Sequence, residues 1–149
     1  MGLVVYTAGS YDLLHFGHVN VLLKAKSMGD YLIVGVSTDS LIKKYKGIKP
    51  IISYKDRTTI IKELKCVDKV IKQSKFFDVN QLKKYKIDII VLGDDWEVKF
   101  FPELQNFLKE FPYIKMVYVP YTKRLSSSSI KEKIIRNAVE IIKSQSKRS

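Results

Sequence analysis

Residues 3–27 read LVVYTAGSYDLLHFGHVNVLLKAKS, an apolar run followed by a polar turn and a helical pattern. The run at 3–7 is rich in β-branched residues and nearly continuous, which is typical of a strand buried on both faces. From residue 16 to 29 the apolar residues recur at the spacing of one helix face. The residues of that face are Val19, Leu22, Leu23 and Ala25. The stretch therefore predicts a strand, a polar loop and a helix, the first part of a unit that joins two parallel strands.

The rest of the chain repeats this alternation. Apolar β-rich runs predict further strands at residues 31–37, 67–71, 88–93 and 115–120. Helical patterns lie at residues 55–65, 79–86, 102–111 and 126–145. Strands that alternate with helices favour an α/β fold, a doubly wound (Rossmann-like) parallel sheet of five strands with helices on both faces. No linker or repeat is visible, so we expect one domain over residues 1–149.

The last helical pattern carries apolar residues at helical spacing, and we expect them to face inward. These residues are Ile130, Ile134, Ile135, Ala138 and Ile141. Beyond them the chain ends in a short basic segment. We expect this tail, residues 144–149, to be disordered.

Composition narrows the class of protein. Of the 149 residues, 46% are apolar and 28% charged, which is typical of a globular protein, and no apolar run approaches the roughly 20 residues of a membrane span. We therefore expect no membrane partner. The single cysteine, Cys66, cannot form an internal disulfide, and residues 1–12 lack the pattern of a secretory signal, so we expect a cytoplasmic protein.

The net charge of +12 indicates an anionic partner. The lysines are spread along the whole chain, which is typical of a solvated surface, whereas nucleic-acid proteins tend to cluster charge on one arm or helix. We therefore expect no nucleic-acid partner. A basic module that binds RNA or a nucleotide without turnover is the non-enzyme alternative, and its binding would weaken steeply with salt.

The unusual polar residues follow predicted strands. Asp12, His15 and His18 come after the first strand, GDDWE (93–97) after the fourth, and YTKRLSSSS (121–129) after the fifth. In open parallel sheets, ligands bind beyond the carboxyl ends of the strands, where the strand order reverses. The sequence therefore predicts one site built from these three loops.

His15 and His18 are three residues apart at the start of the first predicted helix, with Gly17 between them. Both imidazoles can face the region in front of the helix N-terminus, which attracts anions such as phosphate. Gly17 leaves room for a phosphate to approach the backbone. Zinc would need further ligands, but the chain has no third histidine and only one cysteine. Histidines that only make local hydrogen bonds are the remaining alternative.

Ser126 to Ser129 stand where the last helix should begin. Serine is a favoured N-cap, and hydroxyls beside free N–H groups form a second phosphate cradle. A simple cap or a flexible loop is the alternative interpretation.

These motifs, in this order, resemble the nucleotidyltransferases that carry a His-x-Gly-His motif, and within them the cytidylyltransferases. The resemblance rests on YDLLHFGH, GDYLIVGVSTD, a lysine-rich segment, SYKDR, VDKVI, GDDWEVKF and YTKRLSSSSIKEKI. It is closest to the branch that acts on glycerol 3-phosphate. It implies transfer of CMP from CTP to a phosphorylated alcohol, with release of pyrophosphate.

The resemblance also implies roles for single residues. His15, His18 and Lys46 would be the catalytic groups, with Lys46, Asp95 and Trp96 near the second substrate. The implied nucleotide contacts are Gly9, Ser10, Tyr11, Asp12, Gly17, Lys65, Asp94, Thr122, Arg124, Ser126, Ser127 and Ser128. The resemblance implies Mg²⁺ carried by CTP rather than by dedicated metal ligands, and a homodimer.

The chain departs from the family pattern at three places. Tyr121 stands where the family has arginine, and Arg124, three residues on, could replace that charge. Lys65 replaces another arginine and loses its bidentate fork, and Phe76 replaces a tryptophan. These changes leave the alcohol open, including alcohols of the phosphocholine or phosphoethanolamine type. An adenylyltransferase that uses ATP is the other enzyme alternative.

Overall fold

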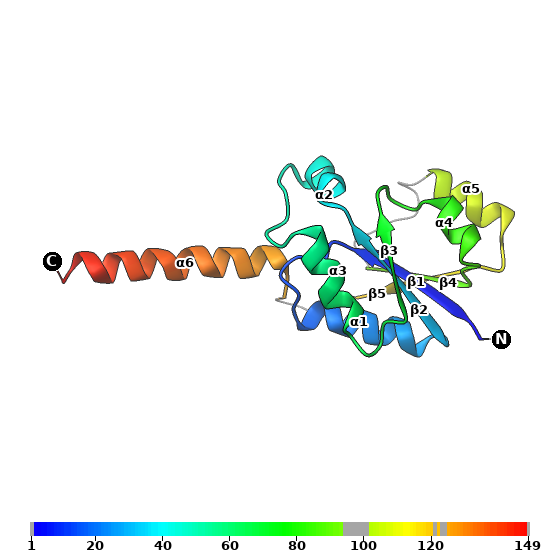
Figure 1. Cartoon of the computed structure of the whole chain (residues 1–149), viewed down its shortest axis with the longest axis horizontal. Helices are drawn as coiled ribbons and strands as arrows, with labels where there is room; N and C mark the ends of the chain where they lie inside the picture. The colour runs from blue at the N-terminus through cyan, green and yellow to red at the C-terminus, as the bar shows by residue number, and fades with distance from the viewer. Residues whose placement is uncertain (1, 94–101, 121, 123–124, 149) are drawn as a thin grey trace.

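The computed structural model describes residues 2–93, 102–120, 122 and 125–148. Its five strands are all parallel and form one sheet in the order β3-β2-β1-β4-β5. The strands are β1 (Val4–Gly9), β2 (Tyr31–Ser37), β3 (Lys69–Gln73), β4 (Ile89–Gly93) and β5 (Lys115–Val119). The helices are α1 (Phe16–Ser27), α2 (Asp39–Lys46), α3 (Tyr54–Lys62), α4 (Val79–Lys84), α5 (Pro102–Glu110) and α6 (Ser127–Ser146). The predicted doubly wound α/β fold is confirmed (Figure 1).

Each face of the sheet has its own apolar core. Along β1, Val5 belongs to one core and Tyr6 to the other, since successive strand residues point to opposite faces. Helices α1 and α3 cover the first core, and helices α4 and α5 cover the second. Because both faces are covered, the strands read as continuous apolar runs rather than as alternating ones.

Helix α2 was not predicted from the sequence. Thr38 caps its N-terminus by accepting a hydrogen bond from Leu41 N (3.1 Å), and Gly47 follows its last residue with φ of 83°. A threonine before a helix and a glycine in the left-handed conformation after it are the usual boundary signals. The helix is only eight residues long and carries four charged side chains, Asp39, Lys43, Lys44 and Lys46, so it holds too few apolar residues to repeat over several turns.

The inward orientation predicted for the apolar residues of the last helix, and for Leu23 of the first, is wrong. Among the described residues of α6 none is buried, and Ile135 is 63% exposed. Figure 1 shows α6 projecting away from the sheet, and the start of the helix, including Lys131, meets the body of the protein. The helix also continues to Ser146, which places the first residues of the predicted disordered tail in regular structure. In α1, Leu23 is exposed, whereas Leu22 and Ala25 are buried.

Spanning a lipid bilayer requires a long helix with an apolar surface all round. In the part of the chain that the structure describes, no helix meets both conditions. Helix α6 is the longest of the described helices, and it is amphipathic.

Candidate active site

A cavity of about 610 Å³ lies at the carboxyl ends of the strands. Four of its lining residues, Gly9, Ser37, Gln73 and Gly93, are the last residues of β1, β2, β3 and β4. In the sheet, β2 and β3 lie to one side of β1, and β4 and β5 lie to its other side. The strand order therefore reverses at β1. The cavity therefore occupies the position where the strand order reverses, as the sequence predicts.

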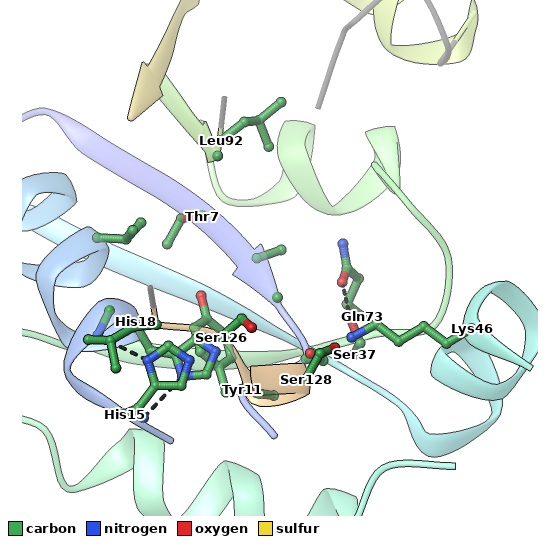
Figure 2. A pocket seen from close by; sticks show the side chains of 18 of the residues that line it. Thr7, Tyr11, His15, His18, Ser37, Lys46, Gln73, Leu92, Ser126 and Ser128 are labelled. Atoms are coloured by element: carbon green, nitrogen blue, oxygen red, sulfur yellow. Dashed lines mark hydrogen bonds between the residues drawn. The ribbon is translucent and has the colours of Figure 1, made fainter. Parts of the chain in front are cut away.

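His15 and His18 form the first wall of the cavity. The two rings stack with their centroids 3.9 Å apart (Figure 2). His15 is the N-cap of α1, and its Nδ1 accepts a hydrogen bond from Gly17 N at 3.0 Å. His18 Nδ1 in turn accepts from His15 N at 3.2 Å. Because both Nδ1 atoms accept, the proton of each neutral ring sits on Nε2, which leaves one N–H donor per imidazole.

The site favours the neutral form of both rings. Burial lowers the pKa of His15. Burial above all, and then the electrostatic effects of His15 and Lys46, lower the pKa of His18 to about 4, and Asp12 opposes them. A neutral imidazole that donates through Nε2 can bind a phosphate oxygen without first taking up a proton.

Gly17 is required by the position of the His15 ring. A Cβ at Gly17 would lie 2.8 Å from His15 Cε1 and 2.9 Å from His15 Nδ1. Real Cβ atoms essentially never come so close to another heavy atom. A side chain at this position would therefore displace the imidazole and break its cap on α1.

Asp12 connects the loop between β1 and α1 to Ile51 and Ile52, and we call these contacts the latch. Its side chain is almost fully buried, and its two oxygens accept hydrogen bonds from Ile51 N and Ile52 N, each at 2.9 Å. These bonds and Lys131 Nζ, 3.4 Å from Oδ2, hold its pKa below the usual range despite burial. The neighbouring residues Tyr11 and Leu13 have φ of 54° and 49°, a conformation that costs about 1–2 kcal/mol each. The latch holds this strained loop in place, so Asp12 stabilises the conformation of the site.

Arg57 joins three segments beneath the site. It is 0% exposed, and its guanidinium donates to Ser10 O, to Ile52 O at 2.9 Å and to Asp39 Oδ1 at 2.6 Å. Because Ser10 itself lines the cavity, this buried network fixes the backbone of that part of the cavity wall.

The N-terminus of α6 forms the opposite wall. Ser126 and Ser129 make a reciprocal capping box with two bonds of 3.0 Å. Ser127 Oγ donates to Asp12 O, so its proton is used to anchor the helix. Among the described residues Ser128 Oγ makes no hydrogen bond, and Ser128 lines the cavity. The serine run stands at the start of the last helix, as predicted, and the hydroxyl of Ser128 is open to the cavity.

Thr122 and Lys46 complete the polar lining. Thr122 Oγ1 accepts a hydrogen bond from Asn20 Nδ2 at 3.3 Å, which ties the segment before α6 to α1. Lys46, the last residue of α2, extends its side chain toward the cavity (Figure 2). Burial and the charge of Lys131 lower the pKa of Lys46, and Asp12 partly opposes them.

The structure brings most of the predicted site residues to this cavity. Those that line it are Gly9, Ser10, Tyr11, His15, Gly17, His18, Lys46, Thr122, Ser126, Ser127 and Ser128. Lys65 is not among them, because it lies exposed before β3, toward the opposite edge of the sheet. Asp94, Asp95, Trp96 and Arg124 lie outside the described residues. Across the described ranges, no cluster of three His, Cys, Asp or Glu side chains is positioned to hold a metal ion.

Sequence reasoning missed part of the lining. Ser37 and Gln73, the final residues of β2 and β3, face the cavity, and so do Tyr45 and Phe77. The two strand ends could have been found, because polar residues at the carboxyl ends of parallel strands are candidates for a site. Tyr45 belongs to the unpredicted helix α2, so the sequence offered no means to place it.

Comparisons with known proteins agree with this site. Residues 6–133 match the family described as cytidylyltransferase-like. A glycerol-3-phosphate cytidylyltransferase from Bacillus subtilis (strain 168) is 41% identical over 132 residues, covering 87% of this chain and 95% of the relative. A relative of the same name from Staphylococcus aureus (strain NCTC 8325 / PS 47) is 35% identical over 131 residues, or 87% of this chain and 93% of that one.

A solved structure gives the same picture of the fold. The crystal structure of the lipopolysaccharide core biosynthesis protein from Thermoplasma volcanium GSS1 superimposes with a TM-score of 0.67 at 32% identity, covering 84% of this chain and 100% of that one. The family match includes most of β1, all of the other four described strands and the histidine pair. The chain belongs to the cytidylyltransferase-like family.

Proposed function

We propose that this protein transfers CMP from CTP to glycerol 3-phosphate, giving CDP-glycerol and pyrophosphate. A phosphate oxygen of glycerol 3-phosphate attacks the α-phosphorus of CTP in line. The new P–O bond forms as the bond between the α-phosphorus and its bridging oxygen breaks, and the pair of electrons leaves with pyrophosphate. The attacking oxygen is already an anion, so no general base is needed.

The observation that carries this proposal is the pair of neutral imidazoles opposite the N-terminus of α6. Each ring offers one Nε2–H donor, and Ser128 offers a free hydroxyl from the other wall. Donors fixed on two sides of a cavity can stabilise the charge that develops on the transferring and leaving phosphates. Lys46 would bridge the two anionic substrates, which would otherwise repel each other.

Magnesium would arrive with the nucleotide. Both oxygens of Asp12, a carboxylate whose charge acts on His18, already accept backbone N–H bonds, so Asp12 is a poor metal ligand. The Ser126–Ser128 hydroxyls and Lys46 suit the triphosphate oxygens rather than a protein cage for the ion. Mg²⁺ bound to the triphosphate supplies additional neutralisation of its charge.

The choice of glycerol 3-phosphate rests on the names of the relatives from Bacillus subtilis and Staphylococcus aureus. The lone Cys66 thiol suits a reducing compartment, so we place the reaction in the cytoplasm.

The active form would be a homodimer. Helix α6 exposes Ile134, Ile135, Val139, Ile141 and Ile142 on one half of its circumference, and a second copy of this helix would cover them. Light scattering should then give twice the chain mass of 17.2 kDa, and Ile135→Glu should give the monomer. A monomeric wild type would contradict the dimer and leave the reaction proposal intact.

The reaction proposal is tested by removing one donor. His18→Asn should lower the rate of pyrophosphate release by at least about 100-fold, because a preorganised donor to the reacting phosphate is lost. Glu132→Gln, on the exposed side of α6, is the matched control and should retain full activity. A His18→Asn enzyme that turns over near the wild-type rate would overturn the assignment.

A further inference from the structure

The cavity extends past the phosphate-binding groups toward the ends of β2 and β3. There it is lined by Ser37, Gln73, Phe76 and Phe77, with Tyr45 from α2 and Lys46 at the boundary. Among the described residues that line the whole cavity there is no carboxylate. This second lobe, defined by Ser37, Gln73, Phe76, Phe77 and Tyr45, has no role in binding the triphosphate as derived above.

Gln73 places a fixed amide in the second lobe. Its side chain is 4% exposed and that of Ser37 is 1% exposed, and the two residues are register partners on adjacent strands. Ser37 Oγ donates to Gln73 Oε1 at 2.6 Å, which fixes the orientation of the amide. Figure 2 shows the amide nitrogen on the side of Gln73 that points away from Ser37.

The amide nitrogen of Gln73 has no hydrogen-bond partner in the described part of the chain. No described residue accepts a hydrogen bond from Nε2, although the residue is more than nine-tenths buried. Among the described residues no side-chain nitrogen or oxygen is both fully enclosed and without a hydrogen-bond partner. Gln73 Nε2 therefore reaches the open space of the cavity, where it can donate to a ligand or a water.

We propose that Gln73, oriented by Ser37, recognises a hydroxyl of the alcohol part of the phosphorylated substrate. This inference rests on the proposed function and extends it, because it assigns the group that selects the alcohol. The NH₂ group can only donate, and a hydroxyl oxygen accepts. An ammonium group only donates and a trimethylammonium group does neither, so neither can satisfy Gln73. The second lobe therefore selects polyol phosphates over aminoalcohol phosphates.

The aromatic rings of the lobe offer the competing chemistry. A quaternary ammonium can bind over aromatic faces, which would favour choline phosphate. In this lobe Tyr45 and Phe76 meet edge to face with centroids 5.0 Å apart, which covers a face of only one of the two rings. Lys46 Nζ lies over the Tyr45 ring, 5.7 Å from its centroid, so that ring already meets a cation. The positive charge of Lys46 at the boundary further disfavours a cation.

The test compares three phosphates on wild type and two variants. The phosphates are sn-glycerol 3-phosphate, propyl phosphate, which lacks both hydroxyls, and ethanolamine phosphate. In Gln73→Met the side chain keeps its length and loses the amide. We expect kcat/KM for glycerol 3-phosphate to fall at least about tenfold, with propyl phosphate and the KM for CTP changed less than twofold. Gln145→Met on the exposed part of α6 is the control.

Gln73→Glu provides a second, opposite prediction. The carboxylate accepts where the amide donated, so the preference for ethanolamine phosphate over glycerol 3-phosphate should rise by about tenfold. Urea unfolding verifies that each variant is folded. If Gln73→Met does not fold, the substrate preference of Gln73→Glu tests the inference in its place. An equal loss with all three phosphates would make Gln73 a structural residue and overturn the inference. A wild type that prefers ethanolamine phosphate to glycerol 3-phosphate would also overturn it, while CMP transfer survives.

Failure of the proposed function is visible before any variant is made. It would appear as a folded wild type that releases no pyrophosphate from CTP with any of these phosphates, and the assignment of Gln73 would fall with it.

Discussion

Replacing Gly17 by alanine should lower the rate of the reaction strongly while changing the stability of the protein little. The new Cβ would begin 2.8 Å from His15 Cε1, and ordinary contacts start at 3.4 Å, so the imidazole must retreat by about half an ångström or more. Its Nδ1 then loses the hydrogen bond from Gly17 N. A displacement of this size at a reacting centre can cost about 100-fold in rate. We expect kcat for pyrophosphate release to fall by about that factor.

The stability of the same variant should change little. Loss of the His15 cap costs about 1 kcal/mol, whereas alanine is better than glycine in a helix by about 0.5–1 kcal/mol. The free energy of unfolding, measured in urea without nucleotide, should therefore stay within about 1 kcal/mol of wild type. Phe16→Ala, in the same turn but 63% exposed, is the control and should alter neither quantity much. Wild-type turnover in Gly17→Ala, or a stability loss above about 2 kcal/mol, would refute this reasoning.

Three further predictions concern the latch, the histidine and the buried arginine. Asp12→Asn turns one acceptor into a donor that faces a backbone N–H. The free energy of unfolding of the free protein, measured in urea, should therefore fall by about 2–4 kcal/mol. A fall of less than about 0.5 kcal/mol would show that the latch does not stabilise the fold. His18 has its folded pKa lowered to about 4 from 6.5, so stability should fall as the pH drops through 6.5 toward 4, by up to about 3 kcal/mol. Plotted against pH, the urea midpoints of His18→Asn should fall less steeply than those of wild type. Parallel profiles of the two proteins would contradict the lowered pKa of His18. Arg57→Met leaves Asp39 and two carbonyls without their donor and should cost about 3 kcal/mol or more, whereas near-wild-type stability would show that the network is dispensable.

The sheet and the two walls of the cavity were predictable because their signals are local. A continuous apolar run such as β2 indicates a buried strand, and a polar residue just after a strand end, such as His15, must lie at the carboxyl edge of the sheet.

Other features depend on contacts between distant residues. Asp12 looked like a nucleotide contact, but Ile51 and Ile52 occupy its oxygens, and a pairing across about forty residues leaves no local pattern. Helix α6 is amphipathic, and its period predicts an apolar face without saying what covers it. The pairing of Ser37 with Gln73 depends on the register of β2 and β3, which only the fold sets.

The central claim is tested most directly by pyrophosphate release from the wild-type protein with Mg²⁺, comparing CTP and ATP with sn-glycerol 3-phosphate as acceptor. The account predicts rapid release with CTP, CDP-glycerol as the second product, and little release with ATP. Release that requires ATP, or no release with CTP and any phosphorylated alcohol, would contradict it.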